Sequence, residues 1–150
     1  MKSILLIIGL TFATAVQSQT ISPPVVELQA RHNTVSGSFI VANQTLFPMA
    51  VAFEPFSLKP GIHPEFRKLD SSVHLELSSS SVRLRPKQAL SISYRITSDS
   101  LPAYLTIYAS FSGLRQREAP IVLKLPHTIW LCEKRGCRKE FFEQAEIKIK

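Results

Sequence analysis

The sequence is short of the residues on which several classes of functional site depend. Its 150 residues include two cysteines, five glycines and one tryptophan. The glycines form no phosphate-binding loop, and no serine lies in a G-x-S-x-G turn that would expose it as a nucleophile. The histidines have no ligand spacing with one another, so each is expected on the surface or in a loop: His32, His63, His74 and His127. The sequence therefore predicts no catalytic residues, no metal site and no cofactor.

Long apolar runs are scarce as well. The stretch from Ile4 to Thr14 is apolar, follows Lys2 and precedes small residues. It is shorter than the roughly 18 residues that a bilayer span needs. With Val16 and Ser18 at positions −3 and −1, residues 1–18 are predicted to be a signal peptide that is cleaved after Ser18. We therefore expect a periplasmic or secreted protein that does not span the membrane after cleavage. The alternative is an uncleaved N-terminal anchor.

The two cysteines, Cys132 and Cys137, enclose only Glu-Lys-Arg-Gly. A thioredoxin-like redox pair has two intervening residues, and no further Cys or His pair completes a four-ligand metal site. Disulfides persist in the oxidising compartments that an exported chain reaches. Two cysteines that face each other across a tight hairpin meet the Cα separation a disulfide requires. We predict a small disulfide loop.

Basic residues outnumber acidic ones, 18 to 11, which gives a formal net charge of +7. They form two concentrations, one around a turn and one late in the chain. These are solvated faces and protected sheet edges, or they contact anionic envelope polymers or acidic partners. Nucleic acid is not expected as the partner of an exported chain. The two groups are Arg83, Arg85, Lys87 and Arg95, and Arg115, Arg117, Lys134, Arg135, Arg138 and Lys139.

Apolar residues recur at every second position in several short segments, as in Leu90 to Ile96 and Tyr104 to Phe111. This period is typical of strands with one buried face. Turn signals separate the segments, so we predict an all-β, immunoglobulin-like β-sandwich of about seven antiparallel strands over residues 19–131. Residues 132–150 are predicted to form the disulfide loop and a short charged tail, with a short helix first and an edge strand over 146–150.

Several connections are predicted from local turn and breaker residues. Residues 33–37 are expected to be a turn, and Phe56 to Asp70 a long irregular connection because it contains prolines and a glycine. Pro126 is expected to interrupt the last strand. In that strand Ile121, Leu123 and Leu125 alternate with other residues. They belong to the sandwich core, or they form a surface that adds to the sheet edge of a partner.

The order of strands and turns resembles the N-terminal domain of PapD-like periplasmic pilus-assembly chaperones. The resemblance rests on FIVAN-QTLFP-MAVAF with Asn43 and Pro48, on VRLRPKQALSISYRI, and on Leu101-Pro102 before the next strand. It covers roughly Val25 to Leu131 and implies one immunoglobulin-like domain, without the second domain of those chaperones. It also implies partners among envelope or pilus-subunit proteins.

The same resemblance gives expectations for a binding site. Chaperones of that family hold a subunit's C-terminal carboxylate with an Arg on the first strand and a Lys on the last. Here Glu27 stands near the Arg position, Arg31 is the only base on that strand, and Lys124 is the corresponding lysine. We expect an exported, non-enzymatic protein-binding domain that is chaperone-like in fimbrial or surface-protein assembly by β-strand addition. The alternative is a structural or adhesive immunoglobulin-like module of the cell envelope.

Overall fold

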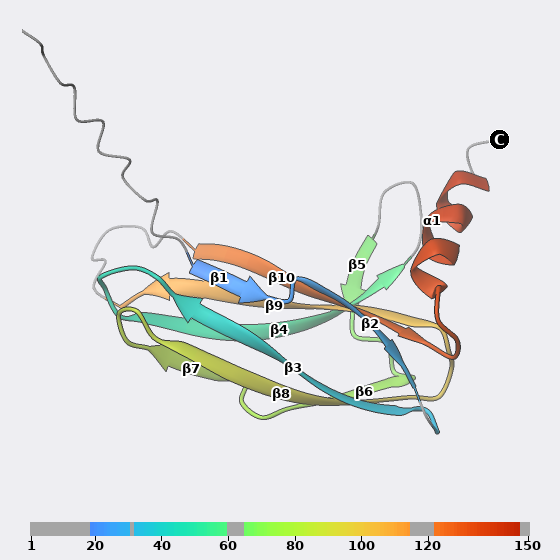
Figure 1. Ribbon diagram of the computed structural model, residues 1–150, viewed down its shortest axis with the longest axis horizontal. Coiled ribbons are helices and arrows are strands. Elements are labelled where there is room, and N and C mark those ends of the chain that lie inside the picture. The colour runs from blue at the N-terminus through green and yellow to red at the C-terminus, as the bar shows by residue number, and fades with distance from the viewer. Residues whose placement is uncertain (1–18, 31, 60–64, 115–121, 148–150) are drawn as a thin grey trace, which may run out of the picture.

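Two β-sheets pack face to face and a single helix lies at one end of them (Figure 1). The computed structural model describes residues 19–30, 32–59, 65–114 and 122–147, with side chains as far as Glu143. The predicted signal peptide lies outside these residues. The strands are β1 (Gln19–Ser22), β2 (Val25–Gln29), β3 (Thr34–Asn43), β4 (Met49–Lys59), β5 (Glu65–Lys68), β6 (Val73–Leu77), β7 (Ser81–Leu84), β8 (Ala89–Ser98), β9 (Ala103–Gly113) and β10 (Val122–Cys132), and the helix is α1 (Cys137–Ile147).

The first sheet has the strand order β1-β3-β8-β6, and the second has the order β2-β10-β9-β4-β5, with β7 also paired to β4. Neighbouring strands are antiparallel except β2 and β10, which are parallel. The chain changes sheets at Pro23-Pro24, since β1 pairs with β3 and β2 pairs with β10. This architecture confirms the predicted all-β, immunoglobulin-like sandwich.

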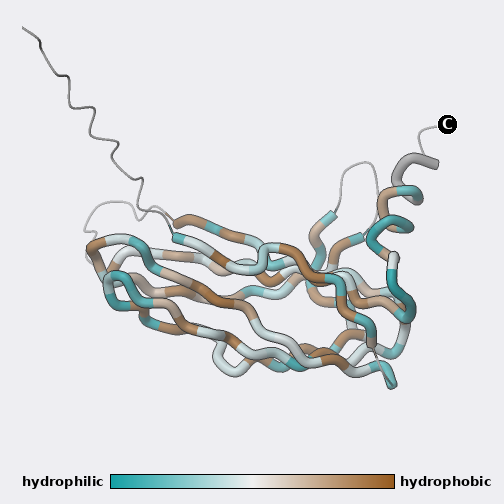
Figure 2. Tube along the Cα trace, in the orientation of Figure 1, coloured by the Kyte–Doolittle hydropathy of each residue, from teal (hydrophilic) through white to brown (hydrophobic). Residues whose placement is uncertain are grey.

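The core lies between the sheets and contains alternate residues of the long strands. Ile92, Tyr94 and Ile96 of β8 face Leu105 and Ile107 of β9, and all five side chains are buried. Figure 2 shows apolar positions spread along the strands, while the turn that leads into α1 is hydrophilic. The period-two pattern therefore identified the buried faces correctly, because each strand has one face on this core.

The predicted turn at residues 33–37 is shorter in the structure. Only His32 and Asn33 form it, with positive φ angles of 53° and 60°, and β3 already begins at Thr34. Gly37 lies within the strand, opposite Tyr94. A Cβ at Gly37 would collide with the ring of Tyr94. The glycine makes room for a buried aromatic side chain and does not mark a turn.

Proline misled the prediction in two further places. Phe56 to Lys59 extends β4, and Glu65 to Lys68 forms β5, so much of the expected irregular connection is sheet; residues 60–64 lie outside the described segments. Pro55 is tolerated in β4 because β7 pairs with residues 49–52 and β5 with residues 56–59, which leaves position 55 between them. β10 likewise continues through Pro126.

The C-terminal segment begins with the predicted disulfide between Cys132 and Cys137. The two cysteines are not on a hairpin as expected: one ends β10 and the other begins α1. Phe141 of α1 packs on Trp130 and Tyr104, with ring centroids 4.5 and 4.8 Å apart, and forms a second small core on the outer face of the second sheet. The short helix is confirmed, whereas the predicted edge strand is wrong at positions 146 and 147, which are helical.

Candidate functional site

Strand β10 is paired unequally on its two sides. Along one side β9 pairs with residues from Val122 to Leu131. Along the other side β2 pairs only with Thr128 to Cys132. Within the described segments, Val122 to His127 therefore has no hydrogen-bonded strand on that second side, although β1 of the other sheet lies near β10 (Figure 1). We call this stretch the free edge of β10. An unpaired edge presents backbone donors and acceptors that another strand can pair with.

The register determines which backbone groups the free edge offers. The amide of Thr128 donates to the carbonyl of Pro24, at 2.8 Å, so it points away from β9. Backbone groups alternate sides along a strand. The amides of Val122 and Lys124 must then point the same way, into the free edge. The nitrogen of Pro126 also faces this edge, which explains how β10 continues through a proline without losing a bond to β9.

The predicted partner-binding side chains lie along this edge. Leu123 is opposite Phe111 and Leu125 is opposite Ala109, so both leucines point to the core side of the sheet. Leu123 is nevertheless 38% exposed, and Leu125 is half-buried. Leu123 thus has the phase of a core residue but is exposed, whereas Leu125 packs against the core. Ile121, the third predicted residue, lies outside the described residues.

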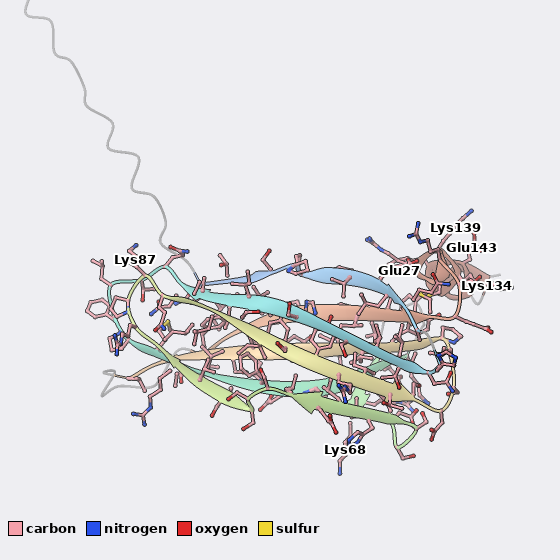
Figure 3. All side chains as sticks on the ribbon, turned by 60° about the horizontal axis from the view of Figure 1, so that its bottom comes forward. Glu27, Lys68, Lys87, Lys134, Lys139 and Glu143 are labelled. Atoms are coloured by element: carbon pink, nitrogen blue, oxygen red, sulfur yellow. A yellow bond between two sulfur atoms is a disulfide. The ribbon has the colours of Figure 1, made fainter. Side chains whose placement is uncertain are left out.

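Of the two expected carboxylate-binding side chains, Arg31 and Lys124, the described residues include Lys124. Lys124 Nζ lies 3.1 Å from Glu54 Oε2, and both side chains are about half exposed. Glu27 is opposite Trp130, six residues further along β10, which corresponds to about 20 Å of strand. One Glu27 carboxylate oxygen accepts a hydrogen bond of 2.6 Å from the amide of Gly136 in the disulfide loop (Figure 3). Arg31 lies outside the described residues.

His127 is a buried residue that the sequence prediction placed on the surface or in a loop. It lies in β10 in phase with Leu125 and Ile129 and is fully buried. Its Nδ1–H donates to the carbonyl of Pro23 at 2.6 Å, and its Nε2 accepts from the Tyr94 hydroxyl at 3.4 Å. Burial lowers the pKa of His127, although the bond to Pro23 opposes this shift. The period-two pattern of β10 would have found this residue.

Burial also affects the tyrosine that bonds to His127. It raises the pKa of Tyr94 to about 12, so the hydroxyl stays protonated and available as a donor. The ring of His127 also packs on Phe39, with centroids 4.8 Å apart. The pair is thus a neutral polar link between the two sheets. Its contacts in the described residues, with the carbonyl of Pro23 and the ring of Phe39, indicate a structural role.

The described parts of the chain contain neither a metal site nor a membrane-spanning helix. In these parts no three His, Cys, Asp or Glu side chains lie close enough to hold a metal ion. The helix in the described segments is too short and too polar to cross a bilayer. The free edge of β10 therefore stands as the candidate site.

Comparison with solved structures identifies the same kind of domain in several proteins. The class 5 fimbriae chaperone CfaA matches with a TM-score of 0.57 at 15% identity, over 79% of this chain and 58% of that chain. A complex of the Salmonella enterica SafA pilin with the SafB chaperone matches with a TM-score of 0.59 at 12% identity, over 82% and 58%. PapD-like domain 7 of human CEP192 matches with a TM-score of 0.51 at 9% identity, over 90% and 99%.

Sequence comparison gives no such match. No protein-family profile and no curated protein sequence matches the chain. The chain spans 58% of the chains that it matches among the two fimbrial structures, and nearly all of the isolated human domain. At these identities the likeness concerns the fold. The chain has the fold of a distant PapD-like, immunoglobulin-like domain.

Proposed function

We propose that the protein is an exported, non-enzymatic protein-binding domain that takes up a strand of its partner on the free edge of β10. The observation that carries this proposal is an unpaired strand edge beside the partly exposed Leu123 and Leu125. Main-chain hydrogen bonds would supply affinity, and alternate side chains would supply specificity. The fold likeness to CfaA supports the proposal, because that protein is a fimbriae chaperone.

The partner class follows from the same comparison. Related folds occur in a pilin–chaperone complex and in a chaperone–adhesin complex. We accordingly propose that the partners are envelope or pilus-subunit proteins and that the domain assists their assembly in the periplasm or after secretion. In this proposal the backbone amide of Lys124 donates a hydrogen bond to the added strand, while the side chain of Lys124 is paired with Glu54. A structural or adhesive envelope module would need no free edge.

The decisive test removes one backbone donor from the free edge. Lys124→Pro deletes the amide that faces away from β9 and leaves the β9 ladder intact, and Pro126 shows that this side of β10 accepts proline. Lys124→Ala is the matched control, because it also removes the ion pair with Glu54. The exported protein is used to recover partners from the cell envelope, and these are identified and quantified by mass spectrometry.

Lys124→Pro should recover at least about tenfold less of the partner than Lys124→Ala, since it loses a main-chain bond of the added strand. Their thermal unfolding midpoints should agree within a few degrees. Leu123→Asp should reduce recovery in the same way. Equal recovery by Lys124→Pro and Lys124→Ala would contradict strand addition, and unfolding caused by Leu123→Asp would assign that leucine to the core.

A further inference from the structure

Exposed apolar side chains gather at the end of the sandwich opposite α1. Leu46 and Phe47, in the turn between β3 and β4, are 66% and 63% exposed, and Leu114 at the end of β9 is 46% exposed. The amide of Leu114 donates to the carbonyl of Pro48 at 3.3 Å, so the two segments are adjacent. We call Leu46, Phe47 and Leu114 the apolar tip. Exposed apolar clusters of this kind mark contact surfaces.

The turn that carries the apolar tip is held in place by hydrogen bonds. The buried Asn43 donates through Nδ2 to the carbonyl of Phe47 at 2.8 Å and to that of Arg85 at 3.1 Å. Its Oδ1 accepts from the amide of Thr45 at 3.0 Å. This bonding fixes the backbone on either side of Leu46. The two apolar side chains are therefore presented outward by an ordered turn, and cannot fold back onto the core without breaking these bonds.

The surroundings of the apolar tip are basic. Lys87 Nζ donates to the carbonyl of Gln44, and Figure 3 shows Lys87 at the end of the molecule opposite Lys134 and Lys139. Arg85 lies in the same turn, and neither base forms an ion pair with a described residue. Acidic residues are absent from the described segments at this end, which are residues 43–49, 85–88, 113–114 and 122–123. Among the described residues, the tip thus combines apolar anchors with positive charge that no acidic side chain pairs.

The chain also enters the sandwich at this end. Gln19, the first described residue, is opposite Asn43, and its Nε2 lies 3.1 Å from the sulfur of Met49. The preceding 18 residues include the apolar run from Ile4 to Thr14. An apolar segment of that kind enters a bilayer during export and remains there if it is not cleaved. The attached domain would then have its apolar tip nearest the membrane surface.

We propose that the apolar tip seats in the interfacial region of an anionic phospholipid bilayer. Leu46 and Phe47 would enter the boundary between headgroups and acyl chains, while Arg85 and Lys87 would contact lipid phosphates. Charge complementarity with lipid phosphates favours a lipid surface over a protein as the occupant, and the entry of the chain at Gln19 keeps the tip near the bilayer while residues 1–18 are still attached. This site is separate from the amides of the free edge, and the proposal does not depend on strand addition.

Insertion is tested by giving the tip a fluorescent reporter. Phe47→Trp is placed in the protein as it is recovered after export, and Phe66→Trp is the matched control, because Phe66 of β5 is 50% exposed but lies away from the tip. The native Trp130 is buried and serves as the background. Both variants are mixed with vesicles of phosphatidylcholine and phosphatidylglycerol that carry bromine on the acyl chains. Insertion should blue-shift the emission of Phe47→Trp, bromine should quench it, and the emission of Phe66→Trp should not change.

Affinity is tested with charge changes at the same place. The double variant Arg85→Glu with Lys87→Glu should bind these vesicles at least about tenfold more weakly, and added salt should remove the difference. Vesicles of phosphatidylcholine alone should bind the wild-type protein more weakly than the mixture. The proposal is overturned if bromine quenches neither variant or both equally. It is also overturned if the apolar tip proves to be required for capture of an envelope protein while vesicle binding is unaffected by the charge reversal.

Discussion

A single buried histidine gives the folded protein a dependence on pH. The carbonyl of Pro23 can only accept, so the short bond fixes His127 as the neutral tautomer with a proton on Nδ1. Tyr94 and Phe39 cover the rest of the ring, and no described carboxylate makes a hydrogen bond or ion pair with it. Protonation would bury an uncompensated charge. This is the physical origin of the lowered pKa of His127.

The sign of the effect on stability follows from proton binding. The unfolded chain takes up a proton near pH 6.5, whereas folded His127 takes it up only at lower pH because its pKa is lowered. The free energy of unfolding should therefore decrease as pH falls below 6.5, with a slope of at most about 1.4 kcal/mol per pH unit from this group, and the loss should level off below the folded pKa. Urea denaturation at a series of pH values measures it.

His74 provides the matched control for this titration. Its side chain is 74% exposed and lies 3.4 Å from Glu76. His127→Gln should lower overall stability and remove the part of the pH dependence that begins at 6.5, while His74→Gln should keep the wild-type slope. An unchanged slope in His127→Gln would mean that another group controls the acid sensitivity of the fold.

At the scale of elements, α1 and the disulfide loop hold down the β2 end of the sandwich. Gln29 Nε2 donates to the carbonyl of Glu133 at 3.2 Å, and Glu27 accepts from the amide of Gly136, so two residues of β2 bond to the loop. Inside α1, Phe141 is buried against Trp130. The ring of Phe142 also lies near Trp130, with centroids 5.9 Å apart, but it is half exposed. The packing of the buried Phe141 and the short covalent loop should therefore dominate the attachment of the helix.

Phe141→Ala should lower the free energy of unfolding by about 3–5 kcal/mol, the usual cost of removing a buried phenylalanine ring. It should also shift the fluorescence of Trp130 to longer wavelength, because the single tryptophan, now 4% exposed, would meet water. Phe142→Ala is the control for stability: this neighbour is 50% exposed and, although its ring lies 5.9 Å from that of Trp130, it should lower the free energy of unfolding much less. If the two variants behave alike, α1 is not docked through Phe141.

The sequence predicted these elements correctly where the pattern lies within one segment of the chain, and less well where the structure depends on contacts between distant segments. The alternation identified β8 because that strand has one wet face and one buried face. β9 shows the same alternation, but Tyr104 and Thr106 on its outer face are buried as well. Proline and glycine led to wrong predictions of turns and breaks where the neighbouring strand accommodates these residues within a sheet. Pro126 faces the free edge, and Gly37 gives way to the ring of Tyr94. Neither fact is visible without the partner strand. The docking of α1 on Trp130 likewise depends on contacts between residues that no local pattern connects.

The sequence indicated the side chains of the candidate site, but it could not show which part of β10 lacks a paired strand. Alternation alone indicated Leu123 and Leu125 but could not separate a core strand from a partner surface. The deciding quantity is the extent of β2, which pairs with β10 only from Thr128 onward. The extent of β2 depends on the chain crossing between the sheets at Pro23-Pro24. The expected carboxylate anchor of Arg31 and Lys124 stays a prediction, because Arg31 lies outside the described residues. Glu27, near the position of the family's Arg, bonds to the disulfide loop at the opposite end of β10 from Lys124.

The whole molecule consequently has two unlike ends. At the α1 end, β10 has a strand on both sides and a second small core on its outer face. At the apolar tip, the same strand is paired on one side only, within the residues that the structure describes. Strands with two neighbours open less readily than edges, so local stability should fall from the α1 end to the tip. Amide hydrogen exchange in the free protein reports this gradient directly.

The exchange rates of two pairs of amides, all within β10, allow the two ends of the molecule to be compared. The amides of Lys124 and Trp130 point away from β9, but only Trp130 has β2 on that side. Lys124 should exchange within the fast, solvent-limited range, whereas Trp130 should be protected by several orders of magnitude. Leu125 and Leu131 both point toward β9, so Leu125 should be only moderately less protected than Leu131. Strong protection of Lys124 in the free protein would show that something already covers the free edge, and would remove the basis for strand addition.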